Sequence, residues 1–398
     1  MKIVMSVLCF LEWIVLGYFM ISVLYLFFFS FIGLFRKNSK NKKSDYYRNI
    51  LVLIPAFKED LVINEVVEDA LKQEYPASFY HIKVIADSLS HETLQLLKNR
   101  SIDVVEVSFA TSTKSKAIRY ALESSGIDYD VVIILDADNI MAPDFLSRMN
   151  NSFANGFRII QGHRIAKNTD TNFALMDAIS EEINNHIFRQ GHRAAGLSSA
   201  LIGSAMGFEY QLFKHLMDGI EAIGGFDKEL ELKIAKEKIK IEYLKDAFVF
   251  DEKVQNATKF TNQRSRWLAA QFLYFKRDII PSFIYLFTKG NIEYFNKAFQ
   301  FLLPPRILLL GTVTLINIFV LIFQVGNIKG WLLVLILTYL VFLFSIPFSF
   351  YNLRTLKVIF DLPRGYFWMI ISLLKSKNAN HEFIHTVHEN RKKQSKKY

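Results

Sequence analysis

The sequence lacks the residues needed for several kinds of site. It contains one cysteine, Cys9, so an internal disulfide and a Cys/His metal cluster are both excluded, and any bound metal must be held by oxygen atoms. No Gly-x-Gly-x-x-Gly stretch follows the first expected strand, and no Gly-Lys-Ser/Thr phosphate loop occurs. A dinucleotide-dependent dehydrogenase and a P-loop ATPase are therefore disfavoured.

Charge is missing from three long stretches of the 398-residue chain, at 13–35, 307–328 and 331–353. Each is long enough for a helix to cross the hydrocarbon core of a bilayer. A secretory signal would have a shorter apolar core, so the first stretch is expected to stay as an anchor. The other two, joined by a tight turn, are expected to form a transmembrane hairpin. Because the spans contain almost no ionisable residues, a transporter is disfavoured.

Basic residues beside these stretches predict their orientation. The first stretch is followed by Arg36, Lys37, Lys40, Lys42 and Lys43. Arg354 and Lys357 follow the last stretch, whereas the hairpin turn holds only Lys329. By the positive-inside rule, the chain is expected to be a multi-pass protein of the cell inner membrane with its middle section in the cytoplasm. Much of the net charge of +10 lies beside the spans, and no nucleic-acid-binding motif is present, so no nucleic acid partner is expected.

Two further segments, 277–297 and 358–374, are apolar but interrupted by charges. Both are too broken to span, so they are expected to lie in the interface plane against membrane lipids. The composition is expected to divide the chain into an anchor (1–36), a basic linker (37–48), a central domain (49–275), an interfacial segment (276–299), a transmembrane hairpin (300–353), and an interfacial helix with a basic cytoplasmic tail (354–398).

The middle section alternates short β-branched runs with helical stretches. Strands are expected at 50–54, 81–86 and 131–135, and helices at 60–73 and 112–124. This alternation predicts an α/β domain with a mainly parallel sheet. Ligands of such sheets gather at the carboxyl ends of the strands, and acidic residues follow all three expected strands.

Asp136 and Asp138 are the most informative of these acids, because they lie one residue apart where a buried strand stops. Two such carboxylates can hold a hard divalent cation and leave positions open, which a diphosphate commonly fills. A pair of solvated turn residues is the alternative, since turn chemistry also favours Asp.

Five motifs in sequence order resemble those of membrane-bound family-two glycosyltransferases of the GT-A fold, which include cellulose, chitin and hyaluronan synthases. They are the strand and loop at 52–59, Ala-Asp-Ser at 86–88, a lysine motif at 114–117, Asp-Ala-Asp at 136–138, and Gln-x-x-Arg-Trp at 263–267. The resemblance covers about residues 50–267 plus the flanking membrane segments. It implies a Rossmann-like cytoplasmic domain with transmembrane and interfacial helices.

The resemblance implies a role for each matching residue. The nucleotide-sugar donor would contact Pro55, Glu59, Asp87, Lys114, Asp136, Asp138, Gln263, Arg266 and Trp267. Asp138 and Asp136 would hold Mg²⁺ or Mn²⁺, and the acceptor would meet Gly203, Ser204 and Trp267. Each has a plain alternative: strand-end turns for Glu59 and Asp87, an interfacial anchor for Arg266 and Trp267, and an ordinary loop for Gly203 and Ser204.

The general base is expected among three acids at the start of a helix. The family usually presents Glu-Asp there, whereas this chain has Lys228 and Glu229. Aligning the leucine that follows makes Glu229 the first choice, Asp227 the second and Glu231 the third. Solvated first-turn acids are the alternative, because a helix N-terminus favours negative charge.

The expected function is inverting transfer of a sugar, of hexosyl or N-acetylhexosaminyl type, from a nucleotide diphosphate donor, with UDP as the expected nucleotide. The acceptor would be a growing polysaccharide or a lipid-linked saccharide at the cytoplasmic membrane face. Three spans are few for a self-contained channel, so polymer export would need a homo-oligomer or a partner. The departure at Lys228 and Glu229 motivates an alternative, a catalytically inactive sugar-nucleotide-binding or scaffold subunit of a polysaccharide assembly complex.

Overall fold

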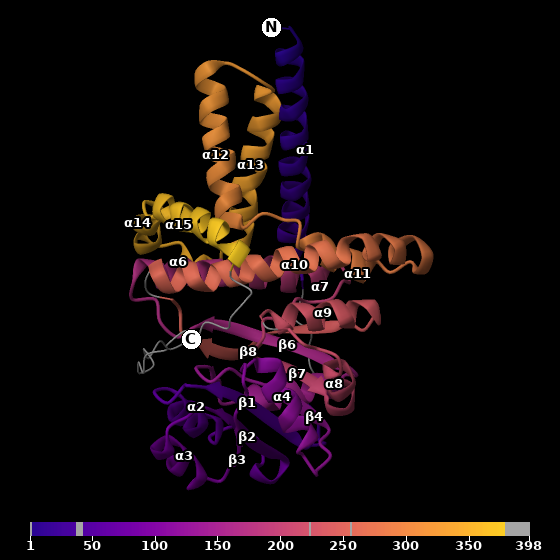
Figure 1. Ribbon diagram of the computed structural model, residues 1–398, viewed down its shortest axis with the longest axis vertical. Helices are drawn as coiled ribbons and strands as arrows, with labels where there is room; N and C mark the ends of the chain where they lie inside the picture. Colours follow the sequence, from indigo (N-terminus) through magenta and orange to yellow (C-terminus); the bar gives the residue numbers. More distant parts are fainter. Residues whose placement is uncertain (1, 37–42, 223, 255–256, 379–398) are drawn as a thin grey trace.

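A computed structural model describes residues 2–36, 43–222, 224–254 and 257–378. Part of the expected basic linker and most of the expected tail, from residue 379 on, lie outside the described residues. In Figure 1 a sheet with its helices occupies one end of the molecule, and three long helices stand together at the other.

The sheet has eight strands in the order β3-β2-β1-β4-β7-β6-β8-β5. Their bounds are β1 (Ile50–Phe57), β2 (Tyr80–Asp87), β3 (Asp103–Val107), β4 (Val131–Ile134), β5 (Ile140–Met141), β6 (Ile159–Ala166), β7 (Met206–Glu209) and β8 (Ile241–Asp251). The pairs β3-β2, β2-β1, β1-β4 and β6-β8 are parallel. Strand β7 runs antiparallel between β4 and β6, and β5 runs antiparallel to β8.

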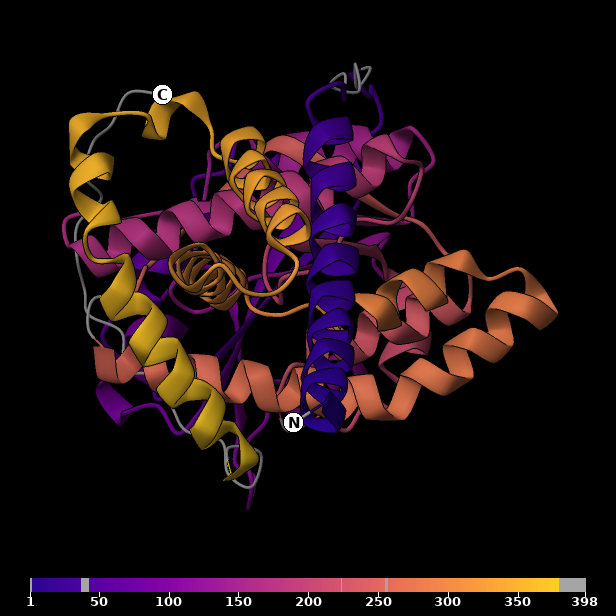
Figure 2. The ribbon, with the colours of Figure 1, turned by 90° about the horizontal axis from the view of Figure 1, so that it is seen from above.

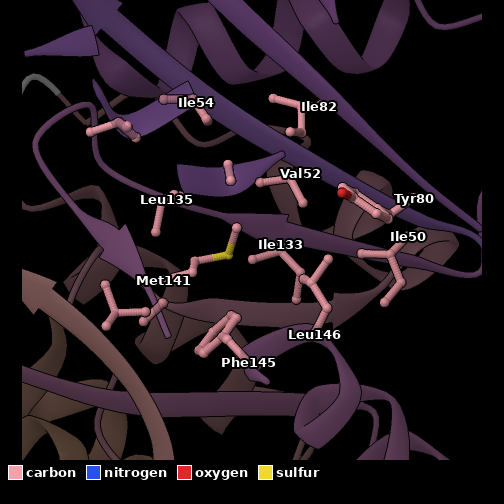
Figure 3. Close-up of a cluster of buried hydrophobic side chains, with 14 of the residues drawn as sticks. Ile50, Val52, Ile54, Tyr80, Ile82, Ile133, Leu135, Met141, Phe145 and Leu146 are labelled. Carbon is pink, nitrogen blue, oxygen red and sulfur yellow. The ribbon is translucent and has the colours of Figure 1, made fainter. Parts of the chain in front are cut away.

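Helices cover both faces of the sheet. Their bounds are α2 (Ile63–Ala70), α3 (His91–Lys98), α4 (Lys114–Glu123), α5 (Phe145–Ala154), α6 (Asn172–Asn184), α7 (His192–Ala194), α8 (Tyr210–Met217) and α9 (Phe226–Lys236). A π-helical turn over Asn185–Gly191 joins α6 to α7. Alternate residues of β1 point to opposite faces: Ile50, Val52 and Ile54 pack with Phe145, as Figure 3 shows, whereas Leu51 packs on the other side.

The prediction of an α/β domain with a mainly parallel sheet is confirmed. The three expected strands appear as β1, β2 and β4, and β1 continues beyond its expected end to Phe57. The helix expected over 60–73 is shorter in the structure, where α2 covers only Ile63–Ala70. The prediction also missed α3 and the edge strand β3, whose residues are half-buried or exposed and so lack a clear apolar signal.

Three helices are long and apolar enough to cross a membrane: α1 (Lys2–Gly33), over its segment Ser6–Gly33, α12 (Arg306–Phe323) and α13 (Ile328–Ser345). The third expected span, at 331–353, was placed too late, because α13 ends at Ser345, just before Pro347. Glu12 on α1 accepts hydrogen bonds from the backbone N of Asn327 (2.5 Å) and from Nε1 of Trp331 (3.2 Å). This carboxylate therefore ties α1 to the turn of the α12–α13 hairpin.

Four helices lie across the foot of these three: α10 (Ala257–Lys289), α11 (Ile292–Gln300), α14 (Leu353–Ile359) and α15 (Leu362–Lys375). Figure 2 shows α12 nearly end-on, between α6 and α15. Several large apolar side chains of the crosswise helices are exposed: Ile280, Ile284, Phe287, Leu353, Phe360 and Leu374. Such surfaces suit an interfacial position, which stays a prediction. The expected domain boundary at residue 275 falls inside α10, which continues through it.

Candidate active site

A single cavity of about 1140 Å³ connects the carboxyl end of the sheet with the crosswise and apolar helices. Every predicted site residue except Ser204 and Glu229 lines it: Pro55, Glu59, Asp87, Lys114, Asp136, Asp138, Gly203, Asp227, Gln263, Arg266 and Trp267. Glu231, the third candidate base, lines it as well. Residues from seven separate segments of the sequence thus meet around one space.

Parallel pairing explains why the strand-end residues meet. Because β2 and β4 both run parallel to β1, their carboxyl ends lie at the same edge of the sheet. Phe57 at the end of β1 is in register with Asp87 at the end of β2, and the Lys58 backbone N donates to the Asp87 carbonyl at 3.1 Å. Lys58 and Ser88 both have left-handed backbone, with φ of 55° and 59°, which turns the chain sharply after each strand.

Lys114 and Ser204 fix the loop that carries Asp136. The Lys114 ammonium forms an ion pair with the Asp136 carboxylate and donates to the Gly203 carbonyl at 2.6 Å. The Asp136 backbone N donates to Ser204 Oγ at 2.9 Å, and Ser204 donates onward to Asn139 at 2.6 Å. Ser204 is fully buried beneath this loop. The prediction that it meets an acceptor therefore has no support from its position, because it orients the loop instead.

Asn139 orients the second carboxylate. Its side-chain amide donates to Asp138 Oδ1 at 2.9 Å and to Asp251 Oδ1 at 3.0 Å. Asp138 is buried to 8% exposure but lines the cavity. Within the described part of the chain, no three His, Cys, Asp or Glu side chains are grouped to enclose a metal. The carboxylates of Asp136 and Asp138 fit a hard cation that takes its remaining oxygen ligands from a bound diphosphate and water.

A buried charge network stands behind these carboxylates. Arg164 on β6 contacts Glu181 (3.0 Å), Asp251 (3.7 Å) and Asp136 (4.0 Å). Lys253 contacts Asp251 at 2.6 Å and Glu181 at 3.5 Å. Burial alone would raise the pKa values of Glu181 and Asp251, but the charges of Arg164 and Lys253 hold both pKa values below their ordinary range. Glu181 and Asp251 are therefore ionised at neutral pH, and their charges fix Arg164 beside the cavity.

Sequence reasoning missed Asp251, Glu181 and Lys253. Asp251 is the last residue of β8, which pairs in parallel with β6. The same strand-end rule that identified Asp87 would have identified Asp251 if β8 had been predicted. Glu181 lies within helix α6 and carries no local signal, since its role depends on partners from β6 and from the segment after β8.

The Gln-x-x-Arg-Trp residues lie in the first turns of α10. Gln263, Arg266 and Trp267 all line the cavity, and the Trp267 side chain is 39% exposed. Arg264 between them pairs with Asp177 and lies 4.2 Å from the centroid of the Trp267 ring. This cation–π contact favours one orientation of the indole, and part of the ring stays exposed beside the cavity.

The candidate bases on α9 face different surroundings. Glu229 pairs with Arg277 of α10 at 2.7 Å and does not line the cavity, so the first choice for the base is not supported by its position. Asp227, the second choice, lines the cavity and faces Gly203, where a Cβ would lie 3.9 Å from the Asp227 side chain. Gly225, with φ of 68°, makes the left-handed turn that starts α9 and gives this orientation.

Glu231 lies one helical turn beyond Asp227, on the same side of α9. Its carboxylate accepts hydrogen bonds from the Leu201 backbone N at 2.7 Å and from Lys297 at 2.8 Å. Burial raises the pKa of Glu231. Because two donors already hold this carboxylate, it supports the Leu201 loop, and Asp227 is the acid best placed to meet a substrate.

The lining of the cavity changes from polar to apolar toward the long apolar helices. Its wall there is formed by apolar side chains of α12, α13 and α15: Ile307, Leu310, Phe342, Ile346 and Met369. A polar end with carboxylates and an apolar end among potential spans thus belong to one space.

Comparisons with known proteins agree with this fold. Residues 48–270 match the family model described as "Glycosyltransferase like family 2". The chain is 23% identical over 235 residues to a beta-monoglucosyldiacylglycerol synthase of Synechocystis, covering 56% of this chain and 47% of the relative. It is 25% identical over 232 residues to the enzyme of that name from Trichormus variabilis, covering 55% and 48%. The chain thus spans about half the length of the curated relatives it matches.

Among solved structures, the mannosyltransferase PcManGT from Pyrobaculum calidifontis, in complex with GDP-Man and Mn²⁺, superposes with a TM-score of 0.58 at 14% identity. The superposition covers 92% of this chain and 98% of the mannosyltransferase. This likeness supports the GT-A-like fold. The family match, which covers more than half of the sequence, shows that the chain is a member of glycosyltransferase family 2.

Proposed function

We propose that this protein transfers a sugar from a nucleotide diphosphate donor, with UDP as the expected nucleotide, to a lipid acceptor at the cytoplasmic face of the inner membrane. One observation carries the proposal: a single cavity joins the carboxylates at the sheet edge to an apolar wall among the membrane helices. A water-soluble acceptor would need no such wall. The names of the curated relatives, which are synthases of a glucosylated diacylglycerol, agree with a lipid acceptor.

The donor would lie against the ends of β1, β2 and β4. Glu59 and Asp87, which line the cavity, would accept hydrogen bonds from the base and ribose of the nucleoside, and Arg266 would bind the diphosphate. Asp136 and Asp138 would hold Mg²⁺ or Mn²⁺, which neutralises the charge of the leaving diphosphate. Lys114 keeps Asp136 in place through its ion pair.

Asp227 is proposed as the general base. Its carboxylate would take the proton from an acceptor hydroxyl as that oxygen attacks the anomeric carbon and the bond to the nucleotide diphosphate breaks. No protein nucleophile is needed, so a single displacement inverts the anomeric configuration. Trp267 offers a flat surface on which the acceptor headgroup can rest beside Asp227.

A donor screen tests the proposal. Purified full-length chain is given UDP-glucose, UDP-N-acetylglucosamine or GDP-mannose with Mn²⁺ and lipid extract, and release of the nucleotide is followed. Asp138→Asn is expected to lower turnover at least a hundredfold, since it removes a metal ligand. The matched control Asp144→Asn changes a carboxylate that pairs with Arg148 outside the cavity, and it should keep full turnover.

Three results would count against part or all of the proposal. Full turnover in Asp138→Asn would remove the metal assignment. Metal-dependent nucleotide binding without release from any donor, in membranes that contain the candidate acceptors, would favour the inactive binding subunit. A product of polymeric size would redirect the acceptor from a lipid to a growing polysaccharide.

A further inference from the structure

At the end of the cavity toward the apolar helices, the carboxylates Glu181 and Asp177 are already paired with other cations. Arg189 pairs with Glu181 at 3.7 Å, and Lys253 pairs with Asp251 at 2.6 Å and with Glu181 at 3.5 Å. Arg264 relies on Asp177. Each of these carboxylates is thus already engaged by side chains that line the same space.

Arg306, the first residue of α12, lines the cavity where its polar part meets its apolar part. Its guanidinium donates to Asn184 and to Ser180 Oγ (3.4 Å) on α6, and both partners are uncharged. Among the described residues, no carboxylate lies within ion-pair distance of Arg306. Leaving a half-buried cation without a counter-charge is costly, so this position favours binding of an anion.

The surroundings of Arg306 increase this preference. The charges that act on it are those of Arg264, Glu181 and Arg189, two positive and one negative. The negatively charged residue, Glu181, already forms ion pairs with Arg189 and Lys253. The first turn of a helix also carries the positive end of the helix dipole, which adds to the attraction for an anion.

The wall beyond Arg306 is apolar. Leu310 lies one turn further along α12, on the same face as Arg306, and Phe342 of α13 and Met369 of α15 complete this part of the wall. A ligand that satisfies both parts carries negative charge at one point and hydrocarbon immediately beyond it. An anionic lipid has this structure, whereas free phosphate supplies only the charge and diacylglycerol only the hydrocarbon.

We propose that the acceptor is a lipid with a phosphate group, which binds between Arg306 and Arg264 while its hydrocarbon lies against α12, α13 and α15. A hydroxyl of the same headgroup would then extend along the cavity toward Asp227. This inference rests on the proposed function and deepens it by naming the acceptor class. It differs from the neutral lipid that the names of the curated relatives suggest.

Lipid binding to the full-length chain tests the inference without any transfer step. Native mass spectrometry from neutral detergent measures the occupancy by phosphatidylglycerol and by diacylglycerol with the same acyl chains. Phosphatidylglycerol is expected to bind at least tenfold more tightly, and Arg306→Gln to lose about tenfold of that affinity, which is the usual effect of removing a charge-assisted hydrogen bond. Arg306→Lys keeps the charge and should retain most of the binding.

The matched control is Arg354→Gln. Arg354 is exposed at the start of α14 and lies outside the cavity, so this variant reports any general attraction of basic residues to anionic lipid. Equal binding of the two lipids, or equal losses in Arg306→Gln and Arg354→Gln, would overturn the inference. Displacement of phosphatidylglycerol by millimolar inorganic phosphate would assign the site to free phosphate and overturn it too.

Nucleotide binding separates this inference from the proposed function. Mn²⁺-dependent UDP binding is measured on every variant and is expected to be unchanged by Arg306→Gln. If the unaltered chain binds no nucleotide, the proposed function fails, whatever lipid is bound. If Arg306→Gln does not fold, the comparison of the two lipids on the unaltered chain still decides the matter.

Discussion

Asp227 and Glu229 give the sharpest test of how this site works, because they are neighbours in sequence but face different partners. Asp227 lines the cavity opposite Gly203, whereas Glu229 pairs with Arg277 at 2.7 Å outside it. Asp227→Asn keeps the shape of the side chain and removes its ability to take a proton. A positioned general base contributes about 10²- to 10⁴-fold in rate, so we expect a loss of kcat of this size with nucleotide binding unchanged.

Glu229→Gln is the control variant. The side chains of Glu229 and Arg277 are 18% and 45% exposed, and an ion pair of this kind contributes about 0–1 kcal/mol to stability. We therefore expect kcat within about threefold of the unaltered protein. Single-turnover release of UDP, measured on both variants at saturating donor, separates the chemical step from binding. The assignment is refuted if Glu229→Gln loses turnover and Asp227→Asn retains it.

Three further predictions concern stability and are measured by thermal unfolding in detergent. Glu181→Gln leaves buried cations unpaired and should lower the free energy of unfolding by about 3–5 kcal/mol. The control Glu209→Gln, whose partner Arg158 is half-exposed, should lower it by only about 0–1 kcal/mol. Equal losses in the two variants would contradict the importance of the buried charge network. Because the pKa of Glu181 is held below that of an unfolded glutamate, its contribution is present above about pH 4.3 and is lost as pH falls below it, so the difference between Glu181→Gln and the unaltered protein should shrink in acid. Glu12→Ala removes two hydrogen bonds to the hairpin turn and should cost about 1.5–3 kcal/mol, and an unchanged melting temperature would show that the contact is not formed.

Strands β1, β2 and β4 could be predicted because each is a largely buried apolar run followed by turn residues. The part of the sheet beyond β4 could not. Strand β7 enters the sheet antiparallel between β4 and β6, and this pairing depends on segments more than 40 residues apart. No local pattern specifies such a partner.

The order of the candidate bases shows a different limit. The choice of Glu229 followed a motif alignment, but the helix decides which acid meets the cavity. Residues two apart on a helix do not share a face, whereas Asp227 and Glu231, four apart, do. All three acids lie on α9, which begins at Phe226. Asp227 and Glu231 line the cavity, whereas Glu229 points to α10 and pairs with Arg277. Helical periodicity, had it been applied to this segment, would have favoured Asp227.

The length of α10 has a consequence for substrate selection. This one helix of 33 residues carries Trp267 near its start and the exposed Phe287 near its end. Pro281 removes one helical hydrogen bond between these two residues, but the helix continues through it to Lys289. If the apolar end rests in the headgroup layer, this continuous helix sets how far the indole stands from the bilayer. The fixed distance would then limit the size of the headgroup that fits between the indole and the bilayer, while acyl tails of any length remain in the lipid. The enzyme should therefore tolerate variation in fatty acids and discriminate strongly between headgroups that differ by one sugar unit.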